Sequence, residues 1–137
     1  MAESKKSRLV LASASPRRRD LLAGMGFELD VVHSNADETP IVGETPEAMA
    51  RRLALLKARD VADRHYAGCD EFVIGADTIV VLGGVVLGKP RDEADARRML
   101  KMLSGATHTV VTAFCVINSA RGAEVVRHVS TAVTFRS

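Results

Sequence analysis

Three arginines follow one another at an unusual position near the start of the chain. In the stretch SASPRRRD (residues 13–20), Ser15 and Pro16 are typical of a helix cap and first helical position, and the arginines at 17–19 come next. The start of a helix carries partial positive charge, so cations there are mildly destabilising. Its backbone N–H groups bind anions, however, and arginines add paired donors for phosphate. The stretch therefore indicates an anion site, with solvated surface arginines as the alternative.

A second polar interruption is the GADT sequence at residues 75–78, inside an apolar segment. Asp77 lies between Ile74 and Ile79, where an unpaired carboxylate costs a large desolvation free energy. Gly75 indicates a bend or the close approach of another backbone. An aspartate in such a place is suited to act as a general base for water or as a ligand for a hard cation. The alternative is a turn aspartate between two shorter strands.

Two lysines and a pair of loop carboxylates give weaker signals. Lys89, in Gly88-Lys89-Pro90, precedes a predicted helix and is placed to bind phosphate, but the P-loop pattern is absent. Lys57 lies at the border of an apolar helical stripe, where a snorkelling surface lysine is the common case. Asp37 and Glu38 lie in a polar loop and could be plain turn formers.

Together these residues combine cations with carboxylates. The cations are Arg17, Arg18, Lys57 and Lys89, and the carboxylates are Glu38 and Asp77. Polyphosphate hydrolysis needs this combination, because cations neutralise phosphate oxygens while carboxylates hold Mg²⁺ or Mn²⁺ and activate water. Neither a serine elbow nor a Cys/His pair is placed for acyl transfer, and the four histidines have no metal-ligand spacing.

The elements that must position these residues alternate between strands and helices. We expect strands at 8–13, 27–34 and 71–82, a Gly83-Gly84 turn into a short strand, and a closing hairpin that turns at 120–123. This order predicts one α/β domain on a mixed rather than purely parallel sheet.

Three helices are predicted from capping residues and apolar spacing. The first starts at Ser15-Pro16, the second near Thr45-Pro46, and the third is capped by Asp92 and closed by Gly105. We expect their buried faces to be, in order, Leu21, Leu22 and Met25; Met49, Leu53 and Leu56; and Ala96, Met99, Leu100 and Leu103.

Composition narrows the class of protein. The 137 residues carry a net charge of +2 and only 4% aromatic residues, so we expect no nucleic-acid partner. The absence of a signal-like or membrane-length apolar run predicts a cytoplasmic protein with no membrane partner. Cys69 and Cys115 match neither a disulfide nor a zinc pattern. We expect a flexible tail at 1–7 and a single domain at 8–137.

Several motifs in order resemble the Maf family of nucleotide pyrophosphatases. They are LASASPRRRDLL, the DE at 37–38, LALLKA, IGADTIVVLGGVVLGKP and ARRMLKMLSGATHTVVTA. The resemblance implies a mixed, twisted sheet flanked by helices, as in Maf and inosine triphosphatase proteins. It also implies hydrolysis of nucleoside triphosphates to monophosphate and pyrophosphate, a divalent cation (Mg²⁺ or Mn²⁺), and a homodimer.

The resemblance also implies a role for individual residues. Asp77 corresponds to the proton acceptor for the attacking water, and Glu38 and Asp77 to the metal or water site. Arg17 and Thr78 correspond to residues that influence substrate choice. Contacts to the triphosphate are implied for Ser13, Arg18, Lys57 and Lys89. The GADT sequence is typical of the branch that prefers dTTP and UTP, whereas the 7-methyl-GTP branch tends to carry a G-S-D-Q version.

The family's pattern continues past residues 133–137 with a helix, a Lys-Ala-Gly-x-Tyr-type segment and a closing strand region. We therefore expect part of the pocket wall and sheet to be missing from this chain, with exposed strand edges that favour self-association. An alternative function follows: a catalytically weak or inactive nucleotide-binding or regulatory fragment, linked to division arrest. A weaker alternative is a triphosphatase that removes damaged purine nucleotides.

Overall fold

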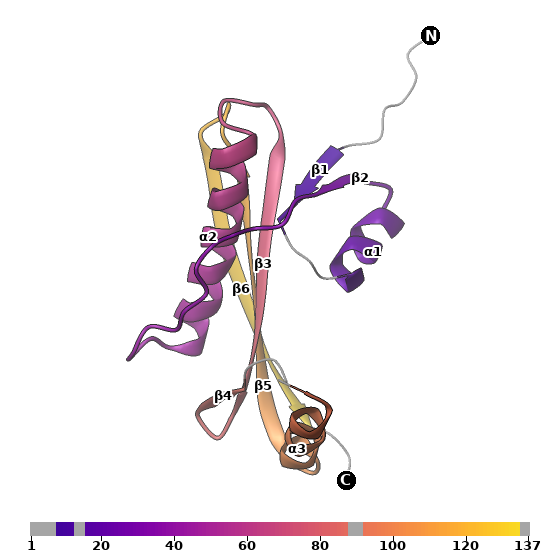
Figure 1. The fold of residues 1–137 in the computed structure, drawn as a ribbon, viewed down its shortest axis with the longest axis vertical. Helices are drawn as coiled ribbons and strands as arrows, with labels where there is room; N and C mark the ends of the chain where they lie inside the picture. The colour runs from indigo at the N-terminus through magenta and orange to yellow at the C-terminus, as the bar shows by residue number, and fades with distance from the viewer. Residues whose placement is uncertain (1–7, 13–15, 88–91, 135–137) are drawn as a thin grey trace.

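The computed structural model describes residues 8–12, 16–87 and 92–134, without the side chains of residues 16 and 17. Its strands are β1 (Arg8–Leu11), β2 (Glu28–Val31), β3 (Phe72–Leu82), β4 (Val85–Leu87), β5 (Thr107–Asn118) and β6 (Ala123–Thr134). Its helices are α1 (Pro16–Gly24), α2 (Pro46–His65) and α3 (Glu93–Leu103). Figure 1 shows β3, β5 and β6 as a long ribbon with α2 alongside, and α3 near one end.

The strands form one mixed sheet in the order β2-β1-β3-β5-β6. β1 pairs in parallel with both β2 and β3, whereas β5 runs antiparallel to β3 and to β6. The predicted mixed sheet and closing hairpin are therefore confirmed. β2 is shorter than the predicted segment 27–34, because its ladder with β1 ends after four residue pairs.

One edge of β3 is left without a strand partner in the middle of its length. β5 pairs with one edge of β3 from Val73 to Val81, so β1 and β4 must both lie on the other edge. β1 pairs there only as far as Ile74, and β4 begins at Val80. Among the described strands, none pairs with residues 75–79 on this side, which we call the open edge of β3.

Helix α2 begins where the sequence predicts and lies very close to the sheet. The hydroxyl of Thr45 accepts a hydrogen bond from the Ala48 N–H, and Pro46 takes the first turn. The helix side facing β3 and β5 carries a repeat of small residues at every fourth position, Ala50, Ala54, Ala58 and Ala62, all buried. Small side chains let the helix axis approach the strands.

Gly75 marks the point of closest approach. A Cβ atom built there would lie 2.3 Å from the carbonyl oxygen of Ala54 and 2.7 Å from the backbone nitrogen of Ala58. No side chain fits at such distances from backbone atoms, so only glycine allows this contact. The expectation of a close backbone approach at Gly75 is confirmed.

The predicted buried faces of the helices are partly wrong. In α2, Leu53 is buried but Met49 and Leu56 are only half-buried, because the alanine side of the helix faces the sheet. Leu21 in α1 and Met25 just after its end are each 65% exposed, and only Leu22 of the predicted face is half-buried, since the short edge strand β2 covers little of this helix.

The prediction for α3 was right at its ends and wrong on its face. Asp92 caps the helix by accepting a hydrogen bond from the Asp95 N–H, and Gly105 follows its end with a positive φ. Leu100, however, is exposed, and the other members of the predicted apolar face are half-buried. Helix α3 lies beside the end of the β5–β6 ribbon, where the described strands cover little of it (Figure 1).

Two further features bear on the class of protein. In the part of the chain that is described, no helix combines the length and apolar character needed to cross a membrane. Both cysteines are free thiols, Cys69 exposed and Cys115 buried in the sheet.

Candidate active site

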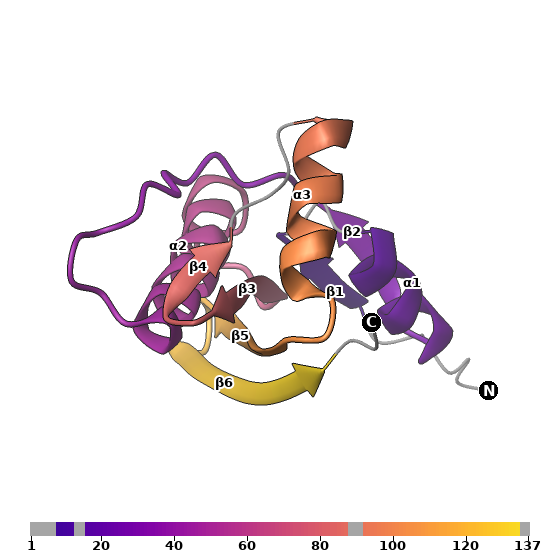
Figure 2. The same ribbon diagram turned by 90° about the horizontal axis from the view of Figure 1, so that it is seen from below.

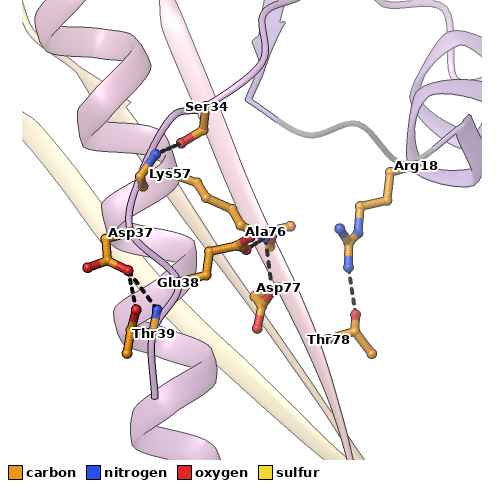
Figure 3. A network of polar contacts seen from close by, with 10 residues as sticks. Arg18, Ser34, Asp37, Glu38, Thr39, Lys57, Ala76, Asp77 and Thr78 are labelled. Atoms are coloured by element: carbon orange, nitrogen blue, oxygen red, sulfur yellow. Dashed lines mark hydrogen bonds and ion pairs between the residues drawn. The ribbon is translucent and has the colours of Figure 1, made fainter. Parts of the chain in front are cut away.

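Three charged side chains meet on the α2 side of β3. The ammonium nitrogen Nζ of Lys57 lies 2.9 Å from Asp77 Oδ1 and 2.9 Å from Glu38 Oε1. It also donates to the backbone carbonyl of Ala76 at 3.3 Å. Figure 3 shows the three groups converging from the loop before α2, from α2 itself and from β3. The structure thus brings together Lys57 and two carboxylates, Asp77 and Glu38, that lie 20 and 19 residues from it along the chain.

Partial burial makes the pairing of these charges important. The Lys57 and Asp77 side chains are 17% and 14% exposed, whereas Glu38 is 52% exposed. Burial lowers the pKa of Lys57, but the hydrogen bonds and negative charges of Glu38 and Asp77 outweigh it, and the net shift is upward. Lys57 is therefore a firmly protonated cation at neutral pH, and it neutralises two carboxylates at once.

Two further predicted site residues, Arg18 of α1 and Thr78 of β3, meet on the opposite face of β3. The Arg18 guanidinium donates a 2.6 Å hydrogen bond to Thr78 Oγ1, and this hydroxyl lies 3.4 Å from Thr112 Oγ1 on β5. Asp77 and Thr78 are neighbours in a strand, so their side chains point to opposite faces of the sheet. In Figure 2, β3 and β5 lie between α2 and α1, in agreement with this division.

The open edge connects these two clusters. Asp77 and Thr78 both lie within residues 75–79, where β3 has no described strand partner on the side of β1 and β4. Burial lowers the pKa of the Arg18 guanidinium from its ordinary value, and the negative charge of Asp77 opposes that shift. Arg18 therefore lies within electrostatic reach of Asp77, and a ligand at the open edge could contact both faces.

Not every predicted site residue can be placed. Ser13 and Lys89 lie outside the described residues. Arg17 lies in α1 as predicted, but only its backbone is described. Arg19 is exposed beside Asp20, in agreement with its interpretation as a surface residue.

The oxygen atoms of Glu38, Asp77 and Ala76 provide some, but not all, of the ligands that a hard divalent cation needs. Two carboxylates and the Ala76 carbonyl surround the Lys57 ammonium, and oxygen ligands of this kind are those that Mg²⁺ and Mn²⁺ prefer. Within the described residues no group of three or more His, Cys, Asp or Glu side chains is arranged to hold a metal ion. A cation here would need further oxygens, such as those of a phosphate.

Two contributors to this region were not singled out from the sequence. Thr112 lies directly opposite Thr78 in the β3–β5 ladder, and Arg52 anchors the loop that carries Glu38. Thr112 follows from strand register, which the sequence alone does not set. Arg52 has no local signal, because its partners lie outside its own helix. Cys115 offers no alternative nucleophile, because burial raises the pKa of its thiol to about 11.

A comparison with protein families assigns the chain to a known group. A family profile described as "Maf-like protein" matches residues 8–137. The chain belongs to this family. The Maf-like match includes both side-chain clusters of the site and every described strand and helix.

Curated relatives agree with the Maf-like assignment. The chain is 51% identical over 130 residues to a protein of Syntrophotalea carbinolica named dTTP/UTP pyrophosphatase. It is 51% identical over 131 residues to a protein of the same name from Geotalea uraniireducens. These alignments cover 95% and 96% of this Maf-like chain but 59% and 66% of the relatives, so the chain spans less than two thirds of their length.

Solved structures share the fold of this Maf-like chain at low sequence identity. The Staphylococcus aureus Ham1 protein superposes with a TM-score of 0.60 at 16% identity, over 92% of this chain and 70% of that chain. A HAM1 protein from Coxiella burnetii gives a TM-score of 0.57, also at 16% identity, over 92% and 71% of the two chains. The predicted fold class, a mixed sheet flanked by helices, is confirmed.

Proposed function

We propose that this chain carries the catalytic groups of a nucleoside triphosphate pyrophosphatase. The substrate is cleaved between its α and β phosphates, and monophosphate and pyrophosphate are released. The observation that carries the proposal is the partly buried Asp77 carboxylate, held by Lys57 at an open strand edge. The names of the curated relatives support dTTP and UTP as the substrates, and GADT at 75–78 is the branch sequence expected for them.

Asp77 has the geometry of a general base. Its contact with Lys57 uses Oδ1, and none of the described residues forms a hydrogen bond with Oδ2. The paired oxygen fixes the orientation of the carboxylate, while the other oxygen can accept a proton from water. A positioned base of this type contributes about 10²- to 10⁴-fold to a rate.

Cationic groups lie on both sides of this base. Lys57 and Arg18 carry positive charge to either face of β3, and Ser13, Arg17 and Lys89 are proposed to complete the phosphate contacts. Phosphate oxygens would compete with Glu38 and Asp77 for the Lys57 ammonium. With substrate bound, the positive charge of Lys57 is then shared with the phosphate oxygens, whereas in the free protein Glu38 and Asp77 balance it.

A divalent cation is proposed to bind at the Glu38 and Asp77 carboxylates together with the substrate, once phosphate oxygens have drawn away the Lys57 ammonium that these carboxylates share in the free protein. When bound, it neutralises charge on the phosphate oxygens. Glu38 and Asp77 supply the protein ligands, and phosphate oxygens complete the set. The same proposal includes a cytoplasmic location, which the sequence predicts, and a homodimer, which the family resemblance implies. Light scattering on the purified chain tests the dimer.

A nucleotide panel tests the proposal. Pyrophosphate release is measured for dTTP, UTP, ITP and 7-methyl-GTP with Mg²⁺ and with Mn²⁺, and the melting temperature is followed in the same samples. We expect metal-dependent release with dTTP and UTP preferred. A rise in melting temperature without pyrophosphate release would instead identify a nucleotide-binding module. Preferred release from ITP would identify a purine triphosphatase.

A further inference from the structure

Glu38 reaches Lys57 from a loop that has no secondary structure of its own. Residues 32–45 connect β2 to α2 without helix or strand, and Glu38 is half exposed. An irregular segment keeps a carboxylate in one place only if other contacts hold it. The position of Glu38 therefore depends on the anchors of this loop.

The anchor nearest to Glu38 is Arg52 on α2. Its guanidinium Nη2 donates to the carbonyl oxygen of Thr39, the residue after Glu38, at 3.2 Å. The same guanidinium holds Glu44 through two hydrogen bonds, from Nε at 2.7 Å and from Nη2 at 2.9 Å. Arg52 thus joins the middle of the loop to its end at the start of α2.

Local geometry makes this anchor effective. The Glu44 and Arg52 side chains are only 11% and 22% exposed, and a two-point Arg–carboxylate contact restricts orientation as well as distance. Asp37 accepts hydrogen bonds from both the N–H and the hydroxyl of Thr39, which makes a tight turn around Glu38. Holding the Thr39 carbonyl therefore holds this turn and the Glu38 between its two ends.

Arg52 does not itself contact the reactive group. Among the described residues, the hydrogen-bond partners of Arg52 are Glu44 and Thr39. The pKa of Arg52 is shifted upward mainly by the Glu44 hydrogen bond, and the charge of Asp77 contributes only a minor part of that shift. We propose that Arg52 is a positioning residue, which holds Glu38 against Lys57 and so prepares the carboxylate pair for substrate and cation. The catalytic part of this inference rests on the proposed function.

Coupling between Glu38 and Lys57 provides a test that needs no substrate. The free energy of unfolding in urea is measured for the wild type, Glu38→Gln, Lys57→Met and the double variant, and the cycle isolates the interaction of the pair. The same cycle is repeated in an Arg52→Met background. We expect coupling in the wild type and its loss without Arg52.

Arg59→Met is the matched control. Arg59 lies on the same helix and forms a two-point contact with Glu124 on β6, away from the loop. We expect the Glu38–Lys57 coupling to persist in this background. Glu44→Gln, which keeps Arg52 but weakens its anchor, serves as a milder second variant if Arg52→Met does not fold, and there we expect the coupling to be reduced. Coupling of wild-type size in Arg52→Met, or in Glu44→Gln where only that variant folds, would overturn the proposal.

Kinetics then separate positioning from general stabilisation. With dTTP as substrate, Arg52→Met should raise KM by about tenfold, the effect of losing one hydrogen bond to a charged group. The same substitution should have no further effect in a Glu38→Gln background. Equal effects in both backgrounds would show that Arg52 acts independently of Glu38 and would contradict its assigned role. If the wild type releases no pyrophosphate, the proposed function fails while the unfolding cycle still decides on Arg52.

Discussion

At the scale of single residues, one ammonium group balances two carboxylates at the site. Lys57 contacts both Glu38 and Asp77, and its removal would leave two like charges facing each other at a partly buried position. Breaking a pair of this kind is costly because the remaining charges keep their desolvation penalty. Lys57 therefore contributes to stability as well as to the proposed binding of phosphate.

Replacing Lys57 tests this electrostatic account. Lys57→Met should lower the free energy of unfolding by about 1–3 kcal/mol at neutral pH, measured by urea denaturation. Lys101→Met, at an exposed position on α3, is the control and should change stability by less than about 0.5 kcal/mol. Equal stability of Lys57→Met and the wild type would contradict the account.

The pH dependence has a defined sign. The folded-state pKa of Lys57 lies above its ordinary value of 10.5, so the folded protein holds this proton more tightly than the unfolded chain does. The stabilisation is fully present below pH 10.5 and is lost as the pH rises through the folded-state pKa. The stability gap between wild type and Lys57→Met should therefore stay constant from pH 7 to 10.5 and narrow above it.

At the scale of the elements, the contact between α2 and β3 sets the geometry of the site. Gly75 lets the helix backbone touch the strand, and a site residue lies within two positions of this contact on each element. Lys57 precedes Ala58 on the helix, and Asp77 is two residues beyond Gly75 on the same face of the strand. The helix–strand distance thus controls the Lys57–Asp77 distance.

A single methyl group tests this contact. Gly75→Ala should lower the free energy of unfolding by about 1–3 kcal/mol and should also reduce turnover. The new methyl group would overlap backbone atoms of α2, so the helix would have to move away from β3. Gly24→Ala is the control, since a Cβ there has no atom within 4 Å. Calorimetry and the pyrophosphate assay measure both effects. Wild-type melting and turnover in Gly75→Ala would contradict the close-contact account.

Local signals in the sequence predict the elements well and their packing less well. The Thr45-Pro46 start of α2 and the Gly83-Gly84 turn are local, so they could be predicted without tertiary information. The alanine side of α2 could not, because apolar spacing favours the larger Met49, Leu53 and Leu56. The close approach at Gly75 on the neighbouring strand explains why residues as small as Ala54 and Ala58 face the sheet there.

For the site, too, residue types could be predicted from the sequence and their packing partners could not. Residue chemistry indicated Asp77, Lys57 and Glu38, and the structure brings these three together. The separation of Arg18 and Thr78 onto the other face follows from strand alternation but depends on Asp77 and Thr78 lying in one continuous strand. The proposed role of Arg52 could not be predicted, because it depends on contacts with a loop whose sequence has no periodic pattern.

At the scale of the whole molecule, the sheet combines a parallel part and an antiparallel ribbon, and residues 75–79 of β3 have no partner on one side among the described strands. β1 and β4 occupy two ends of the same edge of β3, and the catalytic candidate Asp77 lies between them. α1 and α2 bring cations to the two faces of that edge. We propose that the substrate binds at this open edge, where it would lie close to both helices.

Pyrophosphate release from dTTP by the wild type and by Asp77→Asn tests the central claim most directly. Asparagine keeps the shape of the side chain but cannot take the proton, so kcat should fall by about 10²- to 10⁴-fold while circular dichroism and the melting transition show a folded protein. A folded Asp77→Asn variant that releases pyrophosphate at the wild-type rate would contradict the claim that Asp77 activates the attacking water.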